Sequence, residues 1–475
     1  MNNKLLTSCI ITLLCGSAAD SSEAYEAAKG STGVIQWNKK AALDGYTLLA
    51  PTGPGFSKVY LIDNKGWIVH EWDLPGGGHT EILENGDLLR LGAATSPDNY
   101  VNWGGTAGQL AQYKNDGQLL WQYTNVDADS VLHHTFHQTG AGKTFVPVWE
   151  KHSRAEAINA GRIDDDYLYP LFAEGDSGTT PSRCARNTYC GGLWTDVIVE
   201  LDNQGKETGW RWNAWDRLTT SPTDVTKLDI NYHIPEREIS NRSTADYMHV
   251  NSVHFDSVNQ LLVISSRSFN EIYLIDYKTK EIVGRWGNPW ATKSGNEPSW
   301  MNDGDTKLWG PHGANFSSSI NGEVNILVLD NGWMRPEDRR SRVFEIKFRK
   351  NGNSWIPDTT PVWEYQTVAQ QSLLTDFQGG VQRLPNGNTL IASSGMAHLL
   401  EVTPDKKIVW EFISPVFDGG KIKCDFSSEE SAPLTFFRAY KYAENHPGIK
   451  KIHKRPRPFS HICSNGPKKP DREDS

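Results

Sequence analysis

The chain has 475 residues, of which 37% are hydrophobic and 11% aromatic, with 18 tryptophans and 42 glycines. This length allows one large domain or two to three smaller ones. The formal net charge of −9 argues against the basic face of a nucleic-acid-binding protein, so we expect no nucleic-acid partner. An anionic small substrate stays compatible with this charge, because a local pocket can oppose the net charge of the whole protein.

Residues 1–19 are expected to form a signal peptide, with residues 20–44 as a lead-in to the folded domain. Lys4 supplies a positive charge, residues 5–14 are mostly apolar, and residues 16–19 are small. The apolar run is too short to span a bilayer, and no later segment approaches the ~20 apolar residues that a spanning helix needs. We therefore expect a secreted or periplasmic protein without a membrane span. Lipidation of Cys15 is the alternative to cleavage.

Six cysteines occur in the chain, and two of them would leave with the signal peptide. An even number of cysteines in an exported protein favours disulfide bonds. The sequence predicts two of them, Cys184–Cys190 and Cys424–Cys463. A zinc site is the rival interpretation, but the chain contains no Cys-x-x-Cys pair.

One pattern of short strands and tight turns recurs six times along the chain. Each copy contains turns such as Asn-Gly, an aliphatic strand and a last strand that closes on tryptophan. Because a four-stranded unit cannot cover both of its faces alone, radial repetition of such units favours a propeller. We predict an all-β fold, a six-bladed β-propeller over 45–415, with a degenerate seventh blade as the alternative. The copies are 45–72, 79–121, 137–212, 249–286, 312–363 and 379–410.

The six closing tryptophans are expected to pack between blades rather than to bind substrate. Insertions within the repeats are expected to form loops over one face of the domain, where function usually lies. Residues 416–475 are expected to form a C-terminal strap or tail. The tryptophans are Trp72, Trp121, Trp212, Trp286, Trp363 and Trp410, and the insertions are 154–195, 213–247 and 290–308.

Histidines begin four of the six copies. In a propeller the first strand of each blade lines the central channel, so side chains at the strand starts converge at one mouth. Arginine offers a fixed fork of donors for an oxyanion, and imidazole can donate, shuttle a proton or act as a nucleophile. Strand alternation should place His249 and Asn251 on one face. The substrate-binding candidates are His79, His137, Asn251, Arg267 and Asn331.

Four short motifs carry a resemblance to a known family. They are "MHVNSV" around His249, "GPHGAN" around His312, "DNGWMR" ending at Arg335 and "SSGMAHLLEV" around His398. At these residues the chain resembles the bacterial arylsulfotransferases, the PAPS-independent aryl-sulfate sulfotransferases. That family is a six-bladed propeller that moves a sulfuryl group between phenols through a sulfohistidine. The enterobacterial members have a larger N-terminal domain than this chain can supply.

The resemblance implies a catalytic set of His398, His249, His312 and Arg335. His398 would be the nucleophile, the other three would hold the sulfuryl oxygens, and His249 or His312 would transfer a proton. The implied partners are a small aryl sulfate and a phenol. No cofactor is implied, and the turn 303–305 is at best a weak calcium candidate.

Two other functions remain open at this stage. A propeller polysaccharide lyase would act by β-elimination on a sulfated uronate polymer such as ulvan, and it would need a base and an arginine to neutralise the uronate. The third alternative is a non-catalytic binding propeller, which would need no such set. The lyase candidates are His133, His134, His137, Tyr247 and Arg267.

Overall fold

The computed structural model describes ten stretches of the chain. They are 30–53, 55–93, 103–163, 192–232, 245–299, 301–332, 335–336, 338–367, 373–426 and 433–459. The signal peptide expected over 1–19 lies outside them, as do Cys184, Cys190 and Cys463, so both disulfides stay predictions. Within the described residues no helix is long and apolar enough to cross a membrane.

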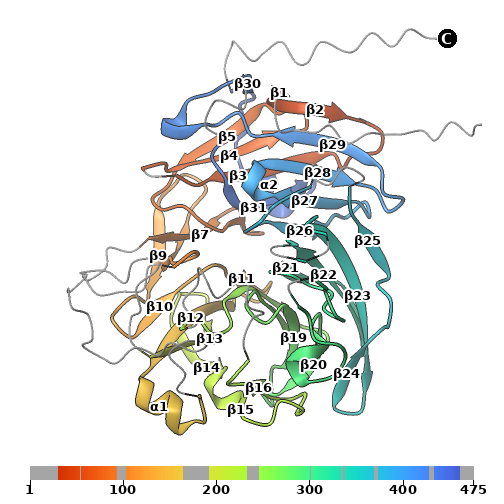
Figure 1. The fold of residues 1–475 in the computed structure, drawn as a ribbon. Helices are drawn as coiled ribbons and strands as arrows, with labels where there is room; N and C mark the ends of the chain where they lie inside the picture. Colours follow the sequence, from red (N-terminus) through yellow and green to blue (C-terminus); the bar gives the residue numbers. More distant parts are fainter. Residues whose placement is uncertain are drawn as a thin grey trace, which may run out of the picture.

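Six antiparallel sheets of four or five strands follow one another around a common centre (Figure 1), and they form the six-bladed β-propeller that the repeats predict. Blade 2 is β6 (Thr80–Ile82), β7 (Leu88–Ala93), β8 (Gly108–Tyr113) and β9 (Leu119–Thr124). Blade 3 is β10 (Ser130–Leu132), β11 (His137–Gln138), β12 (Thr144–His152), β13 (Leu193–Leu201) and β14 (Glu207–Asn213).

The next two blades also follow the predicted repeat borders. Blade 4 is β17 (Val250–Asp256), β18 (Leu261–Ser266), β19 (Glu271–Asp276) and β20 (Ile282–Trp286). Blade 5 is β21 (His312–Ile320), β22 (Glu323–Asp330), β23 (Arg342–Asn351), β24 (Ser354–Pro357) and β25 (Trp363–Tyr365).

Strands from both ends of the chain complete the remaining two blades. Blade 6 is β26 (Gly380–Arg383), β27 (Thr389–Ser393), β28 (His398–Val402) and β29 (Ile408–Ile413), with β2 (Gly33–Trp37) on its outer edge. Blade 1 is β3 (Gly45–Pro51), β4 (Lys58–Asp63) and β5 (Ile68–Asp73), with β31 (Phe436–Ala443) as its inner strand. The residues that build the sheets therefore extend beyond the expected range 45–415 at both ends, because each of these blades needs one strand from outside it.

The ring closes through contacts between inner strands. Neighbouring inner strands contact one another from β11 through β17, β21, β26 and β31 to β6. Gly313 allows one of these approaches: its φ is +68°, and a Cβ there would lie 2.9 Å from the Cα of Gly380. Only glycine tolerates both the backbone angle and the close contact between blades 5 and 6.

A buried ion pair lies at the junction of blades 1 and 6. Lys441 on β31 and Glu401 on β28 are both fully buried, with Nζ and Oε2 2.7 Å apart. Glu401 also accepts hydrogen bonds from the backbone N–H of Leu43 and from Asn388. The negative charge of Glu401 is thus stabilised by one cation and two hydrogen-bond donors, as a buried carboxylate requires.

The hydrophobic core is divided among the six blade-to-blade contacts. Six clusters each combine apolar side chains of two adjacent blades, and every closing tryptophan belongs to or packs against one of them. Trp212 and Trp410 are almost completely buried. Replacing a buried tryptophan by alanine typically costs about 3–5 kcal/mol, so these residues stabilise the fold.

Short elements decorate this frame. They are β1 (Gly30–Ser31) paired with β30 (Asp425–Phe426), β15 (Leu218–Thr219) paired with β16 (Leu228–Asp229), α1 (Arg154–Asn159), α2 (Pro447–Lys451), and the 3-10 turns at Trp215–Arg217, Pro289–Thr292, Ser394–Met396 and Asp418–Gly420. A capping box of Ser153 and Glu156 starts α1. The expected insertions at 154–195 and 213–247 lie partly outside the described residues.

Candidate active site

Four side chains from four blades come together at one end of the central channel. His134 lies in the loop after β10, His249 precedes β17, His312 begins β21, and Arg438 lies on β31. The rings of His134 and His249 have centroids 4.4 Å apart. Burial lowers the pKa of His134 well below its usual value, and the charges of His249, His312 and Arg438 lower it further. We call these four residues the axial cluster.

His312 is held as a neutral imidazole with a defined tautomer. Its Nδ1 lies 2.7 Å from Oδ1 of Asn331 and 3.1 Å from the carbonyl oxygen of Gly310. Since both partners are acceptors, Nδ1 carries the proton and Nε2 keeps its lone pair. Burial lowers the pKa of His312 to about 3, with contributions from His249 and Arg438. No described residue bonds Nε2, which leaves this atom available to a ligand.

His249 is oriented by a carboxylate. Its Nδ1 donates to Oδ2 of Asp246, and within the described part of the chain Nε2 again has no partner. A carboxylate behind a histidine stabilises the imidazolium form, which a neutral amide cannot do. His249 and His312 therefore share a geometry and differ in the charge they can carry.

A third chain of contacts backs His134. Its Nδ1 lies 2.8 Å from Nδ1 of His133, and Nε2 of His133 lies 3.2 Å from Oδ1 of Asp196. The ring of His133 stacks on Trp149 at 3.9 Å. The contact between His133 and Asp196 is within ion-pair distance only, because Nε2 of His133 has no hydrogen-bond partner among the described residues.

The backbone at this end of the channel is unusual. His134 and His249 have φ values of 55° and 53°, in the left-handed region that few non-glycine residues adopt. Gly105 lies against the ring of His134, where a Cβ would come within 2.1 Å of Nε2. Such backbone conformations cluster at functional sites, where the surrounding structure holds them in place.

Arg438 brings the positive charge of the axial cluster. Nη2 donates to the carbonyl oxygen of Asn251 at 2.7 Å, and Nη1 donates to Oγ1 of Thr135 at 3.2 Å. Nε is buried without an acceptor among the described residues. The guanidinium thus bridges blades 1, 3 and 4 across the axis.

Arg267 is a second arginine at this end of blade 4. Its backbone N–H donates to the carbonyl oxygen of His249 at 3.3 Å, and the residue is 5% exposed. Nη1 has no hydrogen-bond partner among the described residues. An unpaired buried guanidinium N–H is costly, so Arg267 remains a candidate for an anionic ligand.

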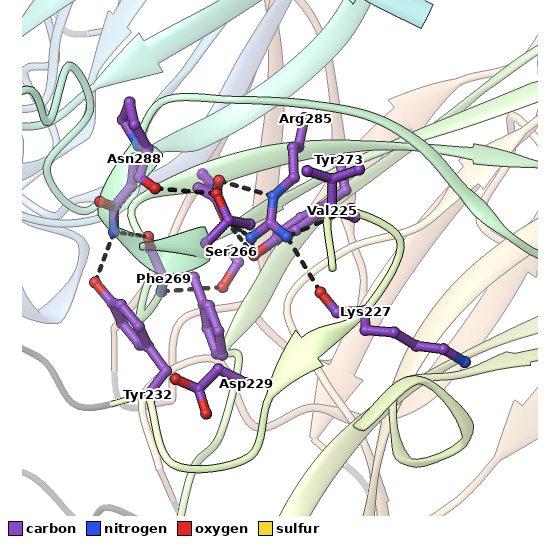
Figure 2. A network of polar contacts seen from close by, with 12 residues as sticks. Val225, Lys227, Asp229, Tyr232, Ser266, Phe269, Tyr273, Arg285 and Asn288 are labelled. Carbon is purple, nitrogen blue, oxygen red and sulfur yellow. Dashed lines mark hydrogen bonds and ion pairs between the residues drawn. The ribbon is translucent and has the colours of Figure 1, made fainter. Parts of the chain in front are cut away.

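A polar network connects the loop between β18 and β19, which carries Arg267, to residues outside blade 4 (Figure 2). Nδ2 of Asn288 donates to the hydroxyl of Tyr232 at 2.6 Å and to the carbonyl oxygen of Phe269 at 2.9 Å. Next to it, Nε of Arg285 donates to Glu271 at 3.0 Å. The network ties the 213–232 segment to blade 4 and so fixes the loop beside the axial cluster.

Asn251 and Asn331, both expected to bind substrate, are occupied by the protein. Asn251 is fully buried, donates to the carbonyl oxygen of Pro311 and accepts from Ser265. The expected alternation with His249 is interrupted, because β17 begins at Val250 and its register shifts between Val250 and Ser252. Asn331 orients His312.

Arg335 does not join the axial cluster. It is 1% exposed, and its guanidinium pairs with Asp330 and donates to the carbonyl oxygens of Asp338 and Arg340 at 2.8 and 3.0 Å. These contacts close the loop after β22. The arginine motif that the resemblance singled out is therefore engaged by its own loop.

His398 does not join it either. His398 begins β28, the third strand of blade 6 counted from the axis, and its Nε2 lies 2.9 Å from Oε1 of Glu411. Both residues are buried. Because only the innermost strand of a blade lines the channel, the predicted convergence of His398 with His249 and His312 is not found.

His137 borders the channel beyond the axial cluster, whereas His79 is 1% exposed and does not line the cavity there. A cavity of about 330 Å³ lies there, lined among others by Glu81, His137, His254, Arg438 and Tyr440. Two residues that line the cavity, His254 and Gly313, come after His249 and His312 in blades 4 and 5. The cavity therefore lies further along the axis than the axial cluster. His79 is buried against Phe136 at 4.1 Å.

No group of three or more His, Cys, Asp or Glu side chains suited to a metal ion occurs in the part of the chain that the structure describes. At the weak calcium candidate, Oδ2 of Asp303 lies 3.8 Å from Nε of Arg335, and Asp305 accepts from the backbone N–H of Asn296. Tyr247, considered for a lyase, donates its hydroxyl to the carbonyl oxygen of Asp229.

These features define a β-propeller with histidines and an arginine on its axis, a site suited to an oxyanion. The family model for arylsulfotransferases (ASST) matches residues 182–436, more than half of the chain. The chain belongs to the arylsulfotransferase family. Membership supports sulfotransferase activity on small aryl substrates in general.

Comparison with curated protein sequences gives no significant match. Among solved structures, a protein of unknown function from Bacteroides caccae is similar, with 13% identity, TM-score 0.43, and 79% of this chain and 96% of that one covered. A virginiamycin B lyase from Staphylococcus aureus has 10% identity, TM-score 0.34, and 81% and 88% coverage. AztD from Citrobacter koseri has 11% identity, TM-score 0.30, and 85% and 99% coverage.

The sequence does not assign two members of the axial cluster to the sulfuryl site. It offers His134 only as a lyase candidate, although the pair His133-His134 directly precedes a blade-opening segment. It predicts Arg438 to lie in the C-terminal tail. The alternating apolar run 436–443 was the available signal that this segment is a strand.

Proposed function

We propose that the protein transfers a sulfuryl group from an aryl sulfate to a phenol, with His312 as the nucleophile. One observation carries the assignment: burial favours the neutral form of His312, its Nδ1 donates to the amide oxygen of Asn331, and no described residue bonds its Nε2. A neutral imidazole with a free lone pair is the form that attacks sulfur.

In the first half-reaction Nε2 of His312 attacks the sulfur of the aryl sulfate. The N–S bond forms as the aryl O–S bond breaks, and the phenolate leaves. In the second half-reaction an acceptor phenol attacks the same sulfur, the N–S bond breaks, and His312 returns to its neutral form. The phenolic proton lost by the acceptor balances the proton gained by the first phenolate.

His249 is suited to carry that proton. Asp246 stabilises its imidazolium, so Nε2–H can protonate the departing phenolate and then accept the proton of the acceptor. Two histidines with different environments thereby take different roles, His312 as nucleophile and His249 as acid and base.

The arginines serve the transferring group. Charge spreads over three oxygens of a loosely bound group in the transition state, as in phosphoryl transfer. Arg438, in the axial cluster, and Arg267, whose Nη1 has no described partner, are the donors available for these oxygens. Preorganised donors in a water-poor site typically supply about 3 kcal/mol each.

The experiment is to incubate the protein with 4-nitrophenyl sulfate, with and without phenol, and to follow nitrophenolate release. Intact-mass analysis after a quench at high pH should show one added SO₃ group when phenol is absent. Turnover without such an adduct would contradict the sulfohistidine. No turnover, together with unsaturated-uronate absorbance on ulvan, would favour the lyase.

A further inference from the structure

A chain of hydrogen bonds leads from blade 2 to Arg438. Oε1 of Glu81 lies 2.9 Å from Nε2 of His79, and Nδ1 of His79 lies 3.0 Å from Oγ1 of Thr135. Oγ1 of Thr135 accepts from Nη1 of Arg438 at 3.2 Å. The hydroxyl of Tyr440 also reaches Nε2 of His79, at 2.7 Å.

The donors along this chain follow from its two ends. Arg438 can only donate, so the hydroxyl of Thr135 accepts from it. The backbone N–H of Phe136 donates to Nδ1 of His79 at 3.4 Å, so Nδ1 is an acceptor and also takes the proton of the Thr135 hydroxyl. His79 must then carry its proton on Nε2, which donates to the carboxylate of Glu81. Although partial burial raises the pKa of Glu81, hydrogen bonds from His79 and Tyr440 keep it below its usual value, so the chain ends on a negative charge.

We propose that Glu81, His79 and Thr135 are positioning residues, which hold the guanidinium of Arg438 next to the histidines of the axial cluster. Only the expected effect on catalysis rests on the proposed function. The contacts themselves give His79 a different role from the substrate binding expected from the sequence.

Arg438 needs such a restraint because there is space beside it. The cavity of about 330 Å³ is lined by Arg438 on one side. Gly380 adds room, since a Cβ there would lie 3.1 to 3.3 Å from the side chain of Arg438. Without Thr135, Nη2 keeps its bond to the carbonyl oxygen of Asn251 but Nη1 loses its acceptor, so the guanidinium tilts toward the cavity.

The matched pair Thr135→Val and Thr135→Ser tests the inference. Valine has the shape of threonine but no hydroxyl, whereas serine keeps the hydroxyl and loses a methyl group. With 4-nitrophenyl sulfate we expect Thr135→Val to lower kcat roughly 10-fold, as loss of an orienting contact does in other sites, and Thr135→Ser to retain most of it. Equal rates for both variants would overturn the inference.

A second readout needs no turnover. In ¹⁵N-imidazole NMR of the full chain we expect the Nε2–H tautomer of His79 in the wild type and in Thr135→Ser. In Thr135→Val, Nδ1 of His79 loses its hydroxyl donor and keeps only the longer contact from the backbone N–H of Phe136. The pKa of His312 rises because the nearby positive charge is no longer held in place. Unchanged His79 and His312 signals in Thr135→Val would overturn the inference.

Glu81→Gln is the second variant, for the case that Thr135→Val does not fold. It removes the negative charge but keeps an acceptor for His79, so a several-fold lower kcat with a native melting curve is expected. An inactive wild type would reject the proposed function while the NMR comparison still decides the positioning role.

Discussion

Asn331 accepts a hydrogen bond from Nδ1 of His312 at 2.7 Å, and both residues are buried. The amide is itself fixed, because Nδ2 of Asn331 donates to the carbonyl oxygens of Thr375 and Gln378. An amide locked in this orientation presents its oxygen, never its N–H, to the imidazole. The tautomer of His312 is therefore set by backbone positions in the adjoining loop.

His312→Gln should abolish both nitrophenolate release and the sulfuryl adduct, because an amide cannot form the N–S bond. His398→Gln is the matched control and should keep turnover per folded molecule. It should cost about 1–3 kcal/mol of stability, since Glu411 loses its imidazole partner in a buried site. Intact-mass analysis and urea unfolding of the two variants separate the roles. Loss of the adduct in His398→Gln alone would return the nucleophile to His398.

Asp246→Asn should slow turnover by ~10²-fold, the usual scale of general acid–base catalysis. The carboxylate that holds Nδ1–H of His249 and stabilises its imidazolium is gone, while the shape of the side chain is retained. Donors with better leaving groups should be affected less, because they need less protonation as they depart. A comparison of nitrophenyl and unsubstituted phenyl sulfate measures this, and equal losses on both would exclude His249 as the acid.

Buried neutral histidines should make the protein less stable as the pH falls. Burial lowers the pKa of His254 from 6.5 to about 4, so between these values the unfolded chain binds a proton that the folded one does not. The free energy of unfolding then rises with pH, by up to about 1.4 kcal/mol per pH unit for each such group.

His254→Phe isolates one of these contributions. The ring of His254 contacts that of His137 in a tilted arrangement, with centroids 3.8 Å apart. Its Nδ1 has no partner in the described part of the chain, so phenylalanine keeps the ring contact and loses no bond at that atom. Urea unfolding from pH 4 to 6.5 should give a shallower slope for the variant. Parallel curves would show that His254 titrates alike in the folded and unfolded states.

Lys441→Met should destabilise the propeller by about 3–5 kcal/mol, because it leaves the buried carboxylate of Glu401 without its cation. Lys441→Met combined with Glu401→Gln should recover part of this loss. Melting and urea curves of the two variants provide the test. A single variant as stable as the wild type would mean that the backbone and amide donors of Glu401 suffice.

The blades could be predicted because their signals are local. Turn residues, strand alternation and a closing tryptophan recur within each copy, and the sheets follow the copies closely. The first copy shows only three strands before Trp72, and the missing inner strand is β31, far away in sequence. Such long-range pairing leaves no local signal, which is why Arg438 was placed in the tail.

The axial cluster could be predicted only in part. Repeat phase places His249 and His312 at the start of inner strands. His79 and His137 share that phase but lie beyond the axial cluster, so phase alone does not fix depth along the axis. The small residues around His398 indicate ligand access in the sequence. The distance of a residue from the propeller axis, however, depends on strand order within the blade, and His398 lies on the third strand from the axis. Arg335 follows a motif-like turn, and its partners come from the same loop.

The pairing of β31 with β3 also determines when, during synthesis of the chain, the propeller can close. Blades 2 to 6 and three of the four strands of blade 1 can be synthesised before the ribosome reaches Phe436. Until then the ring of blades stays open and Arg438 is absent. A nascent or C-terminally truncated chain would hold its histidines without their arginine. Activity would therefore appear only once synthesis is nearly finished, so incomplete copies of the protein would not consume substrate.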